Sequence, residues 1–117
     1  TIQHGNTIGR TLSSTGAGIL NHGTLGLTET IITNNKSGFL GGGIYNGPNG
    51  TLTVTNTIVE NNDALQGGGI NNAGNLTVRR SSVSNNTQQI NKELGVFNAE
   101  SASCYTDAPF PYCYPLP

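Results

Sequence analysis

Gly41-Gly42-Gly43-Ile44-Tyr45-Asn46 is the stretch on which the fold depends, because it returns along the chain at a nearly constant spacing. The other copies are Gly16-Ala17-Gly18-Ile19-Leu20-Asn21, Gly67-Gly68-Gly69-Ile70-Asn71-Asn72 and, more weakly, Leu94-Gly95-Val96-Phe97-Asn98. Their shared apolar residues Ile19, Ile44, Ile70 and Val96 are separated by 25, 26 and 26 positions. A period of this length is typical of solenoids and other repeat architectures.

Two further runs recur after each copy of this stretch. The first has apolar residues at every second position, which is the period of a strand with one buried face. Its copies are Leu25-Gly26-Leu27, Leu52-Thr53-Val54 and Leu76-Thr77-Val78. The second run precedes a pair of asparagines, and its copies are Ile31-Ile32-Thr33, Ile58-Val59-Glu60 and Ser82-Val83-Ser84. The sequence therefore predicts three short strands in each repeat.

Strands this short cannot bury a face alone, so we expect the repeats to stack as coils about 4.8 Å apart, with parallel pairing between copies. The prediction is an all-β parallel β-helix, or solenoid, over residues 1–103, with about four to five coils of 24 to 27 residues. Glycine at the start of each coil is expected to permit a positive φ or a close backbone approach at a corner. Ile8 lies 11 positions before Ile19, so we expect it in the core of an incomplete first coil.

A column of asparagines is expected beside the core ladder, which consists of Ile19, Ile44, Ile70 and Val96. An amide carries both a donor and an acceptor, so identical asparagines one coil apart can bond head to tail along the stack. We interpret these amides as part of the scaffold and not as a ligand site. The column consists of Asn21, Asn46, Asn72 and Asn98, each two residues after a member of the core ladder. His4 and His22 have no copies at equivalent positions, and we interpret both as turn residues outside the repeat.

The composition changes at residue 104, where a tail begins that is predicted to be a cap or an assembly arm. Its prolines cannot donate to a strand ladder. Cys104 and Cys113 are expected to form a disulfide worth about 2.7 kcal/mol in an oxidising compartment, with two free thiols as the alternative. The tail's aromatic side chains are expected to contact a neighbouring subunit or to fold back over the last coil. They are Tyr105, Phe110, Tyr112 and Tyr114.

The charge and hydropathy patterns exclude two classes of partner. Charged residues make up 9% of the chain and the net charge is -1, so the basic surface that a nucleic acid requires is missing. No apolar run approaches the roughly 18 residues of a membrane span, so membrane insertion is not expected. No signal-peptide pattern is present, and Thr1 is expected to be a processed N-terminus if the protein is secreted.

The succession 41–46, 51–56 and 58–62 resembles the right-handed parallel β-helix repeats of large bacterial surface and secreted proteins. It is especially similar to repeats of the polymorphic outer membrane protein type, over about residues 16–98. Glycines stand where that family has alanine, at Gly18, Gly43 and Gly69. The resemblance implies a right-handed coil. Relatives form exposed stalks and adhesive passenger domains, and other branches of the β-helix class are polysaccharide lyases and hydrolases.

The carboxylates do not gather into a catalytic pair. Lyases and hydrolases on this scaffold need carboxylates that converge on one groove. Aligning the coils places Glu29 in a column with Asn56 and Arg80, and Glu60 between a threonine and a serine. We therefore expect no catalytic residue, no metal and no cofactor, and we predict that the chain is not an enzyme.

Outward threonines bind ice where they form a long regular array. Here the column through Thr28 and Thr55 runs into Arg79, so ice binding is the less favoured interpretation and strand propensity explains the threonines. Glycosylation acceptor sequences begin at Asn35, Asn49, Asn75 and Asn85.

These observations predict a non-enzymatic structural module, secreted or at the cell surface, which is either a fibre subunit that stacks head to tail or an adhesive stalk. The expected partner is a second copy or the rest of a longer β-helix. The alternative is a carbohydrate-binding or carbohydrate-processing β-helix fragment that recognises a glycan or a host-surface ligand.

Overall fold

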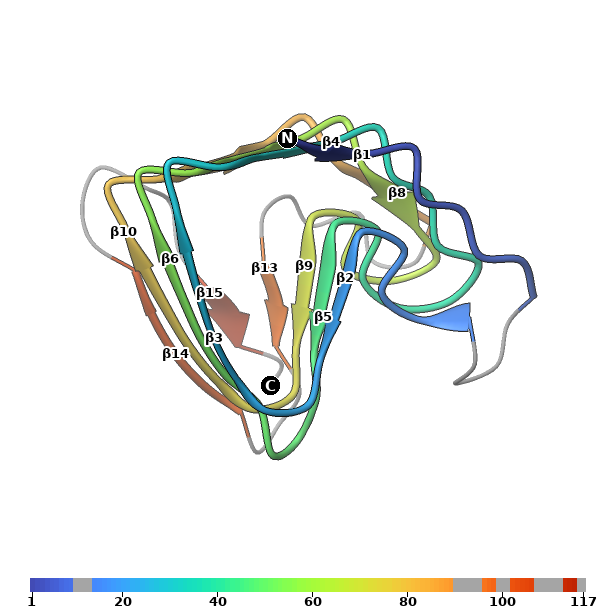
Figure 1. Cartoon of the computed structure of the whole chain (residues 1–117). Coiled ribbons are helices and arrows are strands. Elements are labelled where there is room, and N and C mark those ends of the chain that lie inside the picture. The colour runs from blue at the N-terminus through green and yellow to red at the C-terminus, as the bar shows by residue number, and fades with distance from the viewer. Residues whose placement is uncertain (10–13, 90–95, 99–101, 107–112, 116–117) are drawn as a thin grey trace.

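The computed structural model is a parallel β-solenoid of about three turns (Figure 1). It describes residues 1–9, 14–89, 96–98, 102–106 and 113–115. The predicted all-β parallel solenoid is confirmed. The predicted number of four to five coils is not confirmed. In the described part of the chain, complete turns through three sheets are seen only from residue 19 onward.

The strands form four parallel sheets, which we call A to D. Sheet A contains, in spatial order, β1 (Ile2–Gln3), β4 (Ile31–Thr33), β7 (Ile58–Glu60) and β11 (Ser82–Ser84). Sheet B is the pair β8 (Asp63–Ala64) and β12 (Thr87–Gln88). Sheet C contains β2 (Ile19–Asn21), β5 (Ile44–Asn46), β9 (Ile70–Asn72), β13 (Val96–Asn98) and β15 (Cys113–Pro115). Sheet D contains β3 (Thr24–Thr28), β6 (Thr51–Thr55), β10 (Asn75–Arg79) and β14 (Ser103–Thr106).

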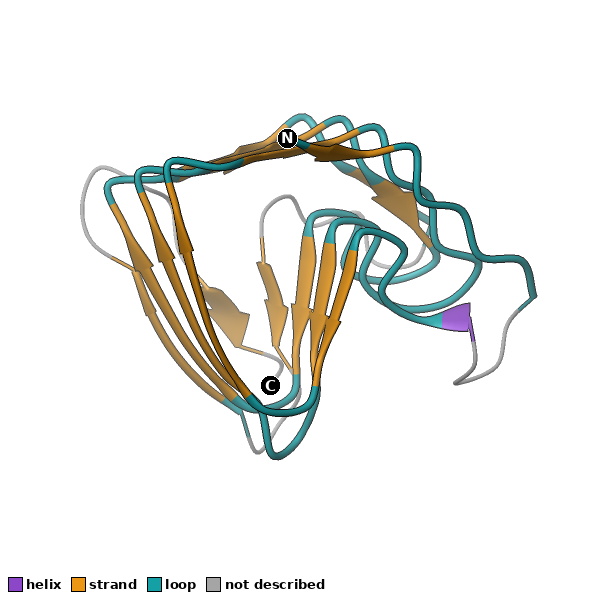
Figure 2. Cartoon of the chain, in the orientation of Figure 1, coloured by secondary structure: helices purple, strands orange, loops and turns teal. Residues whose placement is uncertain are grey.

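Each turn passes through sheets C, D and A in that order, with loops at the corners (Figure 2). The pairing register joins equivalent residues of successive copies, as in Ile44 with Ile70 and Leu52 with Leu76. Because every pairing is parallel and in register, each inward column collects one kind of side chain.

The apolar columns meet between sheets A, C and D and form the core. Members in the middle turns are almost completely buried, among them Ile44, Val59 and Ile70 at 0% exposure. Members of the first turn that lie at the end of the stack are half-buried, among them Ile19 and Leu25. Stacking is therefore what buries each coil, as expected for strands of three to five residues.

Ile8 is not a core residue, which corrects the expectation from spacing. Its side chain is 87% exposed, and the first position of the sheet A column is occupied by Ile2, which is paired with Ile32. The expectation failed because it assumed equal coils. Ile2 lies 17 positions before Ile19, whereas Ile32 lies 12 positions before Ile44, so the first connection between sheets A and C is longer.

Positive φ angles recur at three corners of the coil. The first glycine of each triplet adopts one, at Gly16, Gly41 and Gly67, as glycine at these positions predicts. A second corner repeats the same conformation in asparagines, at Asn34, Asn61 and Asn85. The third corner uses Glu29, Asn56 and Arg80, with φ values of 50°, 48° and 47°.

His4 belongs to the repeat, contrary to our interpretation. Its φ is 65°, and its backbone N–H donates to the carbonyl oxygen of Asn34 at 3.1 Å, so it takes the place of an asparagine in the second corner. The sequence did not reveal this equivalence, because the position holds histidine where the other copies hold asparagine. Histidine can take this place because it is among the non-glycine residues that tolerate the left-handed region.

Candidate functional site

The amide column lies at the corner between sheets C and D. Asn21 Nδ2 donates to Asn46 Oδ1 at 2.8 Å, and Asn46 Nδ2 donates to Asn72 Oδ1 at 2.9 Å. Asn72 Nδ2 donates to the carbonyl oxygen of Ser103 at 3.0 Å. The backbone of Asn98 pairs with Asn72, but its side chain lies outside the described part of the structure. The amides thus form a buried chain of hydrogen bonds parallel to the stack.

Each amide of this column also forms hydrogen bonds with the backbone of its own corner. Asn21 Nδ2 donates to the carbonyl oxygen of Gly23 at 3.1 Å, and Asn46 Nδ2 donates to that of Gly50 at 3.3 Å. The N–H groups of Gly23 and Gly74 donate back to Asn21 and Asn72. These donors and acceptors are used within the protein, so the amides act as scaffold and offer little to a ligand.

A second asparagine column, which our sequence reasoning did not identify, lies at the corner after sheet A. Asn35 Nδ2 donates to Asn62 Oδ1, and Asn62 Nδ2 donates to Asn86 Oδ1, both at 3.0 Å. Gly5 caps the column by donating its N–H to Asn35 Oδ1 at 2.8 Å. The signal was present in the sequence, because the second residue of each asparagine pair recurs with the coil.

The core ladder Ile19, Ile44, Ile70 and Val96 occupies equivalent positions of β2, β5, β9 and β13. Cys113 of β15 follows Val96 in the same register. On sheet D, Cys104 follows Leu76 and packs, half-buried, against the core. The side chain of Cys113 lies outside the described residues, so the disulfide stays a prediction.

The tail aromatics are only partly described. Tyr105 is 51% exposed on the outer face of sheet D, and Arg79 Cζ lies 5.3 Å from the centre of its ring. Its side chain therefore extends from the flank of the solenoid, next to a cation. Phe110 and Tyr112 lie outside the described residues, and Tyr114 is described only as a backbone position of β15.

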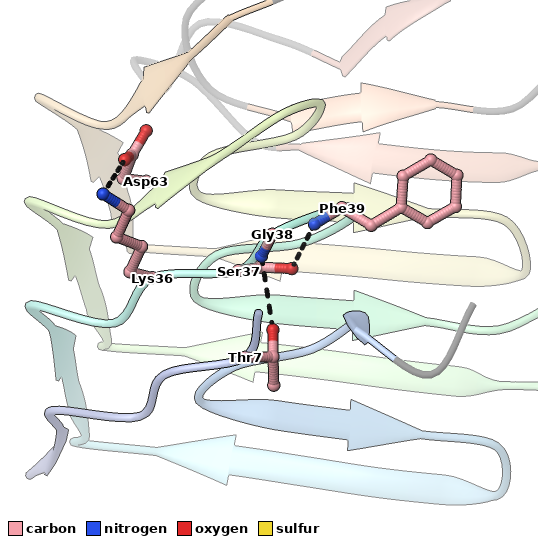
Figure 3. Close-up of polar contacts among 6 residues, drawn as sticks. All are labelled: Thr7, Lys36, Ser37, Gly38, Phe39 and Asp63. Atoms are coloured by element: carbon pink, nitrogen blue, oxygen red, sulfur yellow. Dashed lines mark hydrogen bonds and ion pairs between the residues drawn. The ribbon is translucent and has the colours of Figure 1, made fainter. Parts of the chain in front are cut away.

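Polar contacts also join residues at the corner around sheet B (Figure 3). Lys36 Nζ lies 3.7 Å from Asp63 Oδ2, Gly38 donates its N–H to Thr7 Oγ1 at 3.3 Å, and Phe39 donates to Ser37 Oγ at 3.1 Å. Asp63 Oδ1 is buried and has no hydrogen-bond partner among the described residues. The ion pair is long and its lysine is exposed, which gives the pair little influence on stability.

A hollow of about 420 Å³ adjoins this corner, lined by Asn6, Thr7, Ile8, Gly9, Lys36, Ser37, Gly38 and Gln89. It is open and contains no carboxylate pair, thiol or imidazole among these residues. The nearby carboxylate of Asp63 is paired with Lys36. This pair supplies neither the two carboxylates that glycosidases use nor a nucleophile with its base.

Glu60 has the neighbours that the alignment of the coils predicts. Glu60 of β7 pairs with Thr33 on one side and Ser84 on the other. Within the described ranges, no three histidine, cysteine, aspartate or glutamate residues gather as metal ligands. Nor does any described segment form a helix long and apolar enough to span a membrane.

A comparison with protein-family models, curated proteins and solved structures finds no match to this chain. The proposed function is therefore based on the geometry of the described residues.

Proposed function

We propose that this chain is a non-enzymatic structural module that extends a fibre or stalk by stacking coils end to end. The observation that carries the proposal is the in-register continuation of two buried amide columns and four apolar columns from turn to turn. Such columns gain stability with each added layer, which is the property that an elongated scaffold requires.

The described polar groups support a structural role over a catalytic one. The buried amides of both columns are engaged with each other and with the backbone. The exposed polar side chains are mostly threonine, serine and asparagine, which have neither the charge nor the proton affinity for acid–base chemistry.

The proposal places the protein outside the cell, as a secreted or surface component. The likeness of its repeat to polymorphic outer membrane protein repeats supports this location. An oxidising compartment would also permit the predicted disulfide between Cys104 and Cys113.

Electron microscopy of the purified chain tests the assembly. Sheet C contains five strands, so head-to-tail stacking at the usual strand spacing predicts filaments with an axial repeat of about 24 Å. Monodisperse particles at every concentration would contradict the fibre proposal.

A second candidate function is carbohydrate binding on the outer face of sheet D. Hydroxyl groups lie there in register, as in Thr24 with Thr51 and Thr53 with Thr77, next to the exposed ring of Tyr105. Aromatic rings and neutral hydrogen-bonding groups are the elements of sugar recognition. A glycan array compares wild-type protein with Tyr105→Ala, and loss of binding in the variant is the result that favours this function.

A further inference from the structure

We propose that the outer face of sheet D binds glycans that carry a carboxylate or a sulfate, and that Arg79 is the residue that selects for this negative charge. The inference rests on the carbohydrate-binding candidate function, whose surface it shares, and adds the chemical class of the sugar. It does not depend on end-to-end stacking, because this face lies on the flank of the solenoid (Figure 1).

The outer face of sheet D consists of the alternate residues that point away from the core. Leu52 and Val54 of β6 are buried in the core, so the residues between and beside them point outward. The pairing register arranges the outward residues in three rows across the strands. The rows are Thr24, Thr51, Asn75 and Ser103; Gly26, Thr53, Thr77 and Tyr105; and Thr28, Thr55 and Arg79. The face therefore offers hydroxyl and amide groups, one aromatic ring and one guanidinium.

Arg79 is the only charged residue on the described strands of this sheet. Strands 24–28, 51–55, 75–79 and 103–106 contain no aspartate, glutamate or lysine. The arginine is exposed, and among the described residues no carboxylate forms an ion pair with it. These strands therefore present one positive charge that no acidic side chain of the described structure neutralises, and an anion is the ligand that complements it.

Tyr105 positions the guanidinium before any ligand arrives. Arg79 Cζ lies 5.3 Å from the centre of the tyrosine ring, which is within the range of a cation–π contact. An exposed arginine has a long side chain with many rotamers, and ordering such a side chain on a ligand costs conformational entropy. Because the ring already restricts Arg79, less of this entropy is lost on binding.

The other groups of the face favour a sugar as the carrier of the anion. A planar guanidinium donates paired N–H groups to the oxygens of a carboxylate or a sulfate. Tyr105 is 51% exposed, so part of its ring is available to the apolar face of a sugar. Thr53 and Thr77 lie in the same row as the ring and supply neutral donors and acceptors for sugar hydroxyls. A nucleic acid would need several cations, and these strands have one.

An array of neutral oligosaccharides printed beside their sulfated and carboxylate-bearing counterparts tests the inference. We expect wild-type protein to bind the charged members of a set more tightly than the neutral member, and to lose this preference as salt is raised. Arg79→Gln should bind the charged members at least about fivefold more weakly. Lys36→Gln is the matched control, because it removes the same charge from the corner around sheet B, and it should bind as wild type does.

The outcomes distinguish this inference from the candidate function on which it rests. Equal binding of neutral and charged members by wild type overturns the selection for charge and leaves carbohydrate binding intact. Binding to no glycan overturns both. Unchanged binding by Arg79→Gln, or equal losses in Arg79→Gln and Lys36→Gln, overturns the role of Arg79. The preference of wild type is measured without a variant, so it decides the class of glycan even if Arg79→Gln does not fold. Tighter binding of either the sulfated or the carboxylate-bearing members supports the inference and identifies the anion.

Discussion

Asn46 donates its side-chain amide to Asn72 at 2.9 Å and accepts from Asn21 at 2.8 Å, so the three asparagines form a continuous buried chain of hydrogen bonds across three turns. The same Asn46 amide reaches the carbonyl oxygens of Gly50 and Asn75. One side chain therefore connects its own corner to the coils on both sides, and this relationship determines what its removal should cost.

Asn46→Ala should lower the free energy of unfolding by about 2 to 3 kcal/mol, because it leaves buried partners without a hydrogen bond. Chemical denaturation measures the change. Asn49→Ala is the matched control, since Asn49 is exposed in the adjacent turn and should cost less than about 0.5 kcal/mol. Equal effects of the two substitutions would show that the amide column does not stabilise the fold.

Ile44→Ala should be among the costly core substitutions, at about 2 to 5 kcal/mol, because Ile44 is 0% exposed between Ile19 and Ile70. Ile58→Ala is the control on sheet A, where the side chain is 40% exposed. Thermal unfolding of both variants measures the difference. A larger loss for Ile58→Ala would contradict the assignment of the inward face.

Glu29→Asn should stabilise the protein by about 0.5 to 1 kcal/mol. Glu29 adopts a φ of 50°, and the equivalent residue one turn further on is Asn56, with a φ of 48°. Asparagine tolerates this left-handed conformation better than glutamate. Glu60→Asn removes the same charge from strand β7 and should give no such gain. Denaturant midpoints compare the two, and a gain in both variants would point to charge and not to backbone strain.

Secretion from a glycosylating host should modify Asn49 and spare Asn35 in the folded protein. Asn49 is exposed at a turn, whereas Asn35 is 1% exposed and hydrogen-bonded within the second amide column. A glycan cannot be accommodated at the buried site. Peptide mapping before and after enzymatic deglycosylation identifies the modified residues. Folded protein that carries a glycan on Asn35 would contradict the buried column.

Reduction should lower stability by about 2.7 kcal/mol if Cys104 and Cys113 form the predicted disulfide, because reduction releases a closed loop. Thiol alkylation with mass spectrometry counts free cysteines before and after reduction, and a thermal melt follows stability. A Cys104→Ser/Cys113→Ser variant should match the reduced protein and be insensitive to reductant. Two alkylated thiols in the unreduced protein would refute the disulfide.

The regular part of the fold could be predicted from local patterns. The alternation in Leu52-Thr53-Val54 identifies the inward side chains, and the recurrence of glycine, isoleucine and asparagine sets the stacking register. Both signals are visible without tertiary information because a solenoid repeats the same environment at each coil. The amide column follows from the same periodicity.

The irregular features required the three-dimensional structure. Spacing placed Ile8 in the core, but the longer first connection puts Ile2 there and leaves Ile8 exposed. His4 occupies a corner that holds asparagine in the other turns, and the sequence pattern did not match it to them. Lys36 and Asp63 meet because their coils are stacked, although they lie 27 positions apart in the chain.

By itself, the sequence determined the parallel solenoid, its inward face and its amide column, because each depends on a period repeated within the chain. The tertiary structure alone decided where the periodic order starts, which non-glycine corners adopt left-handed conformations and which charged side chains meet between turns. These features depend on how one turn lies against another, and a local pattern does not encode the neighbour on which it will be stacked.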